Sequence, residues 1–166
     1  MSLSPKLWQA AMSADSRLAS DFNNWKAYHT APIHLARRGT TSAVTEGTFA
    51  GYVKTIREFL GYCKQYEMVS QYDLRLCFDG PKLLRYVFFR VSMNDNKAST
   101  VRNQLFHIKA LMRWCMAMDN VSTREEATAL YAGVDALVKQ LKDLAPRVSK
   151  CKLENPLEIR IFWPLA

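Results

Sequence analysis

Apolar residues recur every three or four positions along most of this 166-residue chain, and this spacing decides the class of fold. An α-helix gathers residues at positions i, i+3, i+4 and i+7 on one face, whereas a half-buried β-strand requires alternation, which no segment shows convincingly. Apolar types make up 49% of the residues, enough to line a buried core. The sequence therefore predicts an all-α fold, a compact bundle of four or five helices.

Five helices follow when this periodicity is combined with capping residues. Their expected ranges are 13–29, 45–66, 79–93, 99–118 and 122–144. An N-cap side chain accepts a hydrogen bond from a first-turn N–H, and the expected N-caps are Thr45, Asp79 with Pro81 in the first turn, Ser99, and Ser122 or Thr123. Pro146 is expected to end the last helix, because proline disrupts a helix interior.

One domain is expected, because the length of the chain suits a single core. We divide the chain into an N-terminal extension over 1–12, a helical domain over 13–146 and a linker or C-terminal arm over 147–166. The arm contains two prolines and an apolar cluster suited to docking on a partner, which consists of Ile159, Ile161, Phe162 and Trp163.

The sequence also limits the compartment. No apolar run approaches the ~20 residues that span a bilayer, and the start, MSLSPKLWQA, lacks the apolar region of a secretory signal. The four cysteines are scattered without a C-x-x-C pair, which argues against a disulfide framework and a zinc site. We therefore expect an intracellular protein without a membrane partner, nuclear if its source is eukaryotic and cytoplasmic otherwise.

Charge is distributed unevenly along the chain, which has 23 basic and 15 acidic residues and a net charge of +8. Seven basic residues and one acid fall between Pro81 and Trp114, a local charge of +6, whereas 120–146 holds three basic and four acidic residues. Such a segment favours a polyanionic partner, and its arginines favour phosphate or base contacts. General solubility is the alternative explanation of the excess.

The segment 99–118, STVRNQLFHIKALMRWCMAM, is unbroken by glycine or proline and has two distinct helical faces. The first is apolar and is expected to face the core; it consists of Val101, Leu105, Ile108, Met112 and Cys115. The second, centred roughly 110° away around the helix, gathers cations beside an aromatic ring and consists of Arg102, Phe106, Lys109 and Arg113. Asn103 lies farther round, as an amide for an adenine edge or as an ordinary surface amide.

The helix expected over 45–66 repeats this arrangement. Lys54, Arg57 and Lys64 lie on one side of its apolar stripe, beside the small residue Gly61. A small residue lets a helix approach a DNA groove closely, although Gly61 equally fits a close contact between helices. Two helices with basic flanks can form one surface across a major groove, which is wide enough to admit a helix.

Residues that would support catalysis are scarce. The sequence contains three histidines but no phosphate-binding glycine loop, nucleophile elbow or H-E-x-x-H motif. An H-x-x-R sequence at His34 and Arg37 has no nucleophile or acid–base partner around it. We therefore expect no enzymatic activity from this chain, and no cofactor, metal or small-molecule substrate.

Three stretches of the sequence resemble the core-binding domain, the SAM-like N-terminal domain, of tyrosine recombinases and phage-type integrases. They are TEGTFAGYVKTIREFLGYC, FDGPKLLRYVFFR and the segment S-T-V-R-N-x-L-x-x-I-x-x-L that begins at Ser99. The likeness covers roughly residues 13–145 and consists of helices and apolar positions, without a catalytic signature.

The resemblance implies a helical domain that forms half of a clamp around DNA in recombination or integration, as in mobile elements. The second and fourth helices of that domain lie near the major groove, and they correspond here to 45–66 and 99–118. The family's catalytic domain follows through a linker that often contains an Asn-Pro step, such as Asn155-Pro156 here. We expect this chain to provide the DNA-binding half without the catalytic residues.

Double-stranded DNA is therefore the expected partner, and self-association on the DNA is left open. The expected contacts are Lys54, Arg57, Lys64, Arg102, Asn103, Lys109 and Arg113, with Arg37 and Arg38 as weaker candidates in the loop before the second helix. The alternative is a helical protein–protein interaction module that does not bind DNA.

Overall fold

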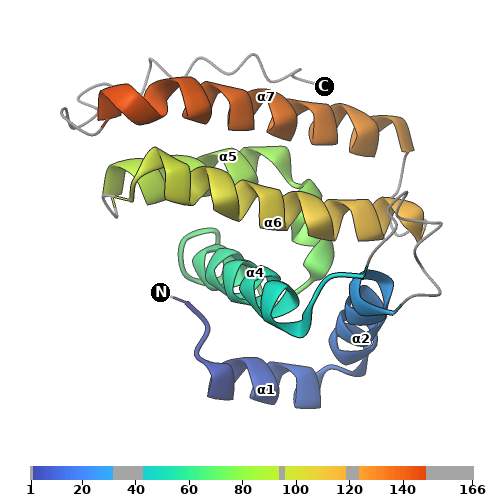
Figure 1. Cartoon of the computed structure of the whole chain (residues 1–166). Coiled ribbons are helices and arrows are strands. Elements are labelled where there is room, and N and C mark those ends of the chain that lie inside the picture. Colours follow the sequence, from blue (N-terminus) through green and yellow to red (C-terminus); the bar gives the residue numbers. More distant parts are fainter. Residues whose placement is uncertain (1, 32–42, 94–95, 119–123, 149–166) are drawn as a thin grey trace.

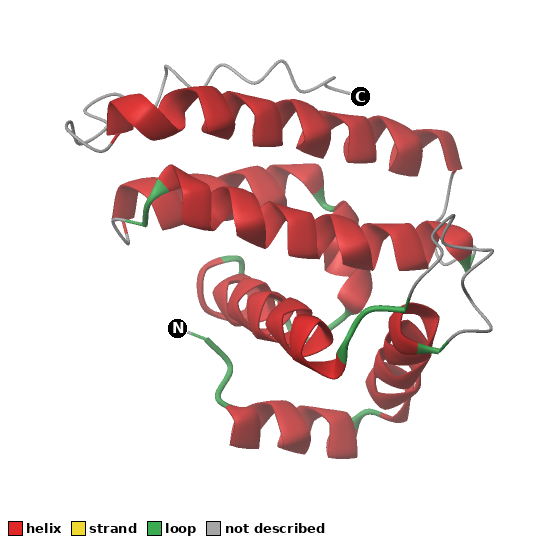
Figure 2. Cartoon of the chain, in the orientation of Figure 1, coloured by secondary structure: helices red, strands yellow, loops and turns green. Residues whose placement is uncertain are grey.

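The computed structural model describes residues 2–31, 43–93, 96–118 and 124–148, with 93 and 143–148 described by backbone alone. Within these ranges the chain is helical and has no strand (Figure 2), which confirms the prediction of an all-α bundle. Its α-helices are α1 (Pro5–Ala14), α2 (Ser16–Thr30), α4 (Glu46–Tyr66), α5 (Gly80–Phe88), α6 (Ala98–Ala117) and α7 (Arg124–Val148). A 3₁₀-helix, η2 (Leu74–Phe78), precedes α5, and a π-helix, η3 (Phe89–Met93), follows it.

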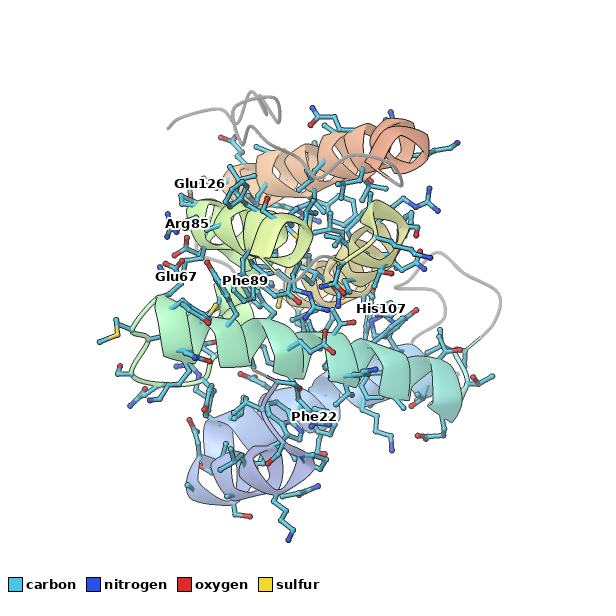
Figure 3. All side chains as sticks on the ribbon, turned by 90° about the vertical axis from the view of Figure 1, so that its left-hand side faces the viewer. Phe22, Glu67, Arg85, Phe89, His107 and Glu126 are labelled. Carbon is cyan, nitrogen blue, oxygen red and sulfur yellow. The ribbon has the colours of Figure 1, made fainter. Side chains whose placement is uncertain are left out.

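Helix α6 lies at the centre of the bundle (Figure 1). Helix α7 runs antiparallel along one side of α6, α5 lies behind it, and α4 lies on the side opposite α7, with α2 and α1 beyond. In the view turned by 90° (Figure 3), α4 runs across the picture while α6 is foreshortened, so α4 crosses α6 steeply. The central helix therefore meets neighbours on several sides and keeps little free surface.

The core is built on the apolar face expected for 99–118. Its five members are fully buried, at 0% exposure for Val101, Leu105, Ile108, Met112 and Cys115. They belong to one hydrophobic cluster with side chains from the surrounding helices, among them Trp25, Leu60, Leu83 and Val134. The prediction for this face is confirmed.

Local hydrogen bonds set two of the helix starts as expected. The Thr45 hydroxyl accepts from the backbone N–H of Thr48, and the Asp79 carboxylate accepts from that of Lys82. The prediction that Ser99 caps the next helix was wrong. Helix α6 begins one residue earlier, after Lys97, which makes no side-chain cap bond. The proposed caps at 122 and 123 lie outside the described residues.

The first predicted helix, 13–29, corresponds to α2, but its first two residues are the end of α1, and the two helices are separated by Asp15. This residue has an extended backbone, with φ −126° and ψ 102°, and ends α1. Its carboxylate accepts hydrogen bonds from the N–H groups of Arg17 and Leu18, so the same residue caps α2. The predicted helix therefore begins about three residues too early, and most of α1 falls in the stretch that was expected to precede the helical domain.

The stretch 1–12, expected to precede the helical domain, contains most of α1. Ser4 caps this helix by accepting from Leu7 N–H, and proline occupies its first turn. Leu3 and Trp8 are buried in the main hydrophobic cluster. Within the described part of this stretch, the chain therefore contributes to the core.

The end of α7 also differs from expectation, because the helix continues past Pro146 to Val148. Proline lacks the N–H that would bond to the carbonyl four residues earlier. This loss affects a single bond in the last turn, so the helical backbone persists there.

Candidate nucleic-acid interface

Helices α4 and α7 cover opposite flanks of α6 and leave a strip of the α6 surface accessible between them. On the α4 flank, the Nδ1 atom of His107 is hydrogen-bonded to Oγ1 of Thr55 at 2.7 Å, and Figure 3 shows His107 between α6 and α4. On the α7 flank, the ammonium group of Lys109 is ion-paired with Asp135. The side chains that remain accessible on α6 lie between these two contacts.

This strip carries the exposed side chains Asn103, Phe106 and Arg113, with Arg102 partly buried among them. Lys54 is exposed on α4, one turn after Gly51. Gly51 faces α6, because a methyl group built there would make an ordinary van der Waals contact with His107, 3.7 Å from Cε1. Lys54 therefore lies at the edge of the contact between the two helices. We call Lys54, Arg102, Asn103, Phe106 and Arg113 the α4–α6 face.

The three cations of the α4–α6 face have no partner among the described residues. Lys54, Arg102 and Arg113 make no hydrogen bond or ion pair there, and Nε of Arg102 is buried without an acceptor. By contrast, several basic side chains elsewhere are paired with carboxylates, namely Lys26–Glu46, Arg75–Asp21, Lys82–Asp79, Arg85–Glu67 and Arg90–Glu58. Cations that are not neutralised within the fold favour an anionic partner.

Lys109 does not belong to this surface, although the sequence placed it beside Arg102 and Arg113. Lys109 is 9% exposed and is ion-paired with Asp135, and its Nζ lies 4.7 Å from the ring centroid of Tyr131. Helix α7 supplies both partners and covers Lys109. We therefore remove Lys109 from the set of proposed DNA contacts.

Two further candidates, Arg57 and Lys64, are engaged within the protein. Arg57 donates from Nε, at 2.8 Å, and from Nη2 to the Leu3 carbonyl, so it ties the N-terminal segment to α4. Lys64 is exposed near the end of α4 and donates to the Ser70 carbonyl at 3.0 Å. We leave both out of the α4–α6 face.

The loop candidates Arg37 and Arg38 lie outside the described residues. The loop leaves and re-enters the described fold close to one point, because Val44 N–H donates to the His29 carbonyl at 3.0 Å. The contribution of Arg37 and Arg38 to DNA binding stays a prediction.

Sequence reasoning missed a buried polar junction behind the face. Glu58 of α4 accepts from Nε2 of Gln104 at 2.7 Å and lies 3.3 Å from Nη2 of Arg90 in η3. Gln104 is only 8% exposed, although it adjoins the exposed Asn103 in sequence. The junction links α4 to α6 and so holds Lys54 in a defined position relative to Asn103. The π-helix that places Arg90 has no recognisable signal in the sequence.

A further cation, Lys142, was missed because the segment 120–146 is close to neutral overall. Lys142 is exposed on α7 and has no partner among the described residues. It lies two helical turns after Asp135 and therefore on the same side of α7. Since α7 runs antiparallel to α6, the side of α7 that carries Asp135 and Lys142 runs alongside α6 from Lys109 toward Arg102.

His107 lies at the seam, the contact between α4 and α6, and contributes an uncharged side chain to it. Burial lowers the pKa of His107 from its ordinary value of 6.5, which favours the uncharged imidazole at neutral pH. A neutral ring accepts or donates one hydrogen bond at Nδ1, in keeping with its contact to Thr55. His107 therefore joins α4 to α6 and adds no positive charge to the face.

No group of three or more His, Cys, Asp or Glu side chains among the described residues is placed to hold a metal ion. A depression where η2 meets α5 is lined by residues that include Asp73, Arg75 and Asp79, whose charges are balanced by ion pairs with one another or with neighbours. No described helix has the length and apolarity to cross a membrane.

No family model, curated protein or solved structure matches this chain. The resemblance to the core-binding domain of tyrosine recombinases therefore stays a prediction from the sequence pattern.

Proposed function

We propose that this protein binds double-stranded DNA, with the α4–α6 face against the duplex. The observation that supports this most directly is that Lys54, Arg102 and Arg113 have no carboxylate partner within the described fold. DNA phosphates supply the missing counter-charges, and contacts of this kind position a protein on the duplex.

The dimensions of the face suit a DNA groove. At ~1.5 Å per residue, Arg102 and Arg113 lie about 16 Å apart along the α6 axis. The major groove is about 12 Å wide and admits an α-helix. Lys54 comes from α4, which crosses α6 steeply. With α6 along the groove, Lys54 is therefore available to phosphates at the groove edge.

The sequence resemblance supports the same proposal. The helices that the core-binding domain of tyrosine recombinases lays near the major groove correspond to α4 and α6. Under this proposal the chain serves DNA recombination or integration as a binding unit and supplies no catalytic residue of its own.

A salt titration with random-sequence duplex DNA tests the proposal. The logarithm of the binding constant should fall linearly with the logarithm of salt concentration, by about 0.9 for each phosphate neutralised. Replacing the two exposed cations, Lys54→Ala with Arg113→Ala, should reduce this slope by about 1.8, because each cation neutralises one phosphate. Fluorescence anisotropy of labelled DNA measures the binding constant.

The matched control removes two exposed cations from other helices, Lys6→Ala with Arg17→Ala. This variant has the same net charge as the test variant, and its slope should stay close to that of the wild type. An equal reduction of the salt slope in the two variants would mean that binding follows net charge alone and that the α4–α6 face is not the site. Circular dichroism confirms that both variants keep their helical content.

The alternative function, a helical protein–protein interaction module, is favoured by a different surface. Tyr66, the last residue of α4, and Met68, just after the helix, are 47% and 85% exposed. Exposed apolar side chains occur singly on many proteins, so this observation is the weaker of the two. A stable oligomer in sedimentation, together with no affinity for random duplex DNA at low salt, would replace the DNA-binding proposal with this one.

A further inference from the structure

Phe106 is the exposed phenylalanine of the described fold, and it lies among the cations of the α4–α6 face. The other phenylalanines of the described ranges are buried or partly buried, whereas Phe106 is 46% exposed. Its neighbours along α6 are Arg102 and Asn103 one turn before it and Arg113 two turns after it. An aromatic ring in this position adds apolar surface to a face that is otherwise polar and charged.

The contacts of Phe106 within the protein account for only part of its ring. Nζ of Lys109 lies 5.9 Å from the ring centroid, and the same ammonium group is ion-paired with Asp135. One face of the ring therefore borders a cation that is already neutralised. The exposed remainder faces away from the core, on the side that the proposed function places against DNA.

Asn103 and Phe106 are spaced to reach neighbouring base pairs. They are separated by about 4.5 Å along the helix axis, at ~1.5 Å per residue. Base pairs are stacked at about 3.4 Å intervals along the duplex. In the major groove an asparagine amide pairs with N6 and N7 of adenine, and a phenylalanine ring packs against the C5-methyl group of thymine.

We propose that Asn103 and Phe106 read adenine and thymine in the major groove, so that the preferred DNA has A·T pairs opposite the middle of α6. Asn103 donates to N7 and accepts from the N6 amino group of an adenine, and Phe106 covers the methyl group of a thymine in a neighbouring pair. This inference rests on the proposed function, and it adds base selectivity to a surface whose cations would bind any sequence.

The experiment starts with a library of DNA duplexes that contain a randomised segment of about one helical turn, ~10 base pairs. Duplexes that bind the full protein chain are selected from it. Each thymine of the selected duplex is then replaced in turn by uracil, which removes only the methyl group. At one position, uracil should lower the affinity of the protein for the duplex about fourfold, which is the change expected when one methyl group loses its apolar contact. Phe106→Ala should bind the thymine and uracil duplexes equally.

Two further variants separate base reading from a merely structural role of the ring. Phe106→Leu retains an apolar side chain and should keep most of the preference for thymine over uracil. Asn103→Ala should lose a roughly tenfold preference for adenine over other bases in a neighbouring pair. The same variant should keep the preference for thymine over uracil. Both positions are exposed, so both variants should fold as the wild type does.

The outcomes distinguish this inference from the proposed function. Salt-dependent binding without any thymine position sensitive to the methyl group would overturn the inference and leave general DNA binding intact. A thymine preference that survives Phe106→Ala would also overturn it, because another side chain would then contact the methyl group. Loss of all duplex binding by the wild-type protein would overturn both.

Discussion

Lys109 lies where α6 meets α7, and three side chains enclose its ammonium group. It is ion-paired with Asp135, and Nζ lies 4.7 Å and 5.9 Å from the ring centroids of Tyr131 and Phe106. At 9% exposure, the side chain has exchanged most of its hydration for these contacts. A charge buried in this way is stable only while its partner is present. Lys109 therefore contributes to the stability of the fold.

Replacing Lys109 should separate stability from DNA binding. Lys109→Ala removes the ion pair and the packing of the stem, and it should lower the free energy of unfolding by about 1–3 kcal/mol in urea denaturation. Lys109→Met keeps the packing of the stem and should lose less. The folded Lys109→Met variant should have the wild-type salt slope for duplex DNA. A slope reduced by about 0.9 would show that Lys109 contacts a phosphate after all.

Polar contacts join α4 to α6 along the seam beside the proposed interface. His107 meets Thr55 at 2.7 Å, and its ring lies 5.1 Å from that of Tyr52. Gln104 donates to Glu58 farther along the seam. Because these contacts have directional requirements, they fix the crossing of the two helices more narrowly than apolar packing alone.

The seam should weaken in mild acid. Burial lowers the pKa of His107 below its ordinary value of 6.5, so the unfolded chain takes up a proton that the folded chain resists. The stability from this residue is present above pH 6.5 and is lost as the pH falls through the lowered pKa. Chemical denaturation at a series of pH values should show this fall, and His107→Gln should reduce it. An unchanged fall in His107→Gln would assign the effect to other groups.

Helix starts could be predicted where the signal is local. Thr45 and Asp79 cap α4 and α5 through bonds to backbone groups within the next turn, and their side-chain chemistry is visible in the sequence. Asp15 caps α2 in the same local way, but the predicted helix was begun at residue 13, so this cap was missed. The π-helix η3, which follows α5, has no such local signal in the sequence.

The candidate site could be predicted only in part, because it depends on the whole molecule. The sequence placed Arg102, Lys109 and Arg113 on one arc of α6, but α7 then covers Lys109 and leaves Arg113 exposed. In the same way, the carbonyl that engages Arg57 belongs to Leu3, far away in sequence. Periodicity assigns side chains to a face of one helix. Which part of that face stays free is decided by distant segments.

The steep crossing of α4 over α6 makes the two ends of α4 unequal at the level of the whole molecule. Lys54 lies at the α4–α6 face, whereas Lys64 lies about 15 Å farther along the helix, near Ser70. Acylation of exposed lysines, read by mass spectrometry with and without duplex DNA, should therefore show protection of Lys54 and continued reaction at Lys64.

This footprint uses the unmodified sequence, so it is independent of any effect of substitution on folding. Lys6, exposed on α1, is an internal control that should react equally in both states, and the buried Lys109 should react slowly in both. Protection of Lys64 or Lys6 without protection of Lys54 would move the duplex to another side of the bundle. Protection of Lys54 alone would place it where α4 and α6 meet, because Lys54 occupies the edge of that contact.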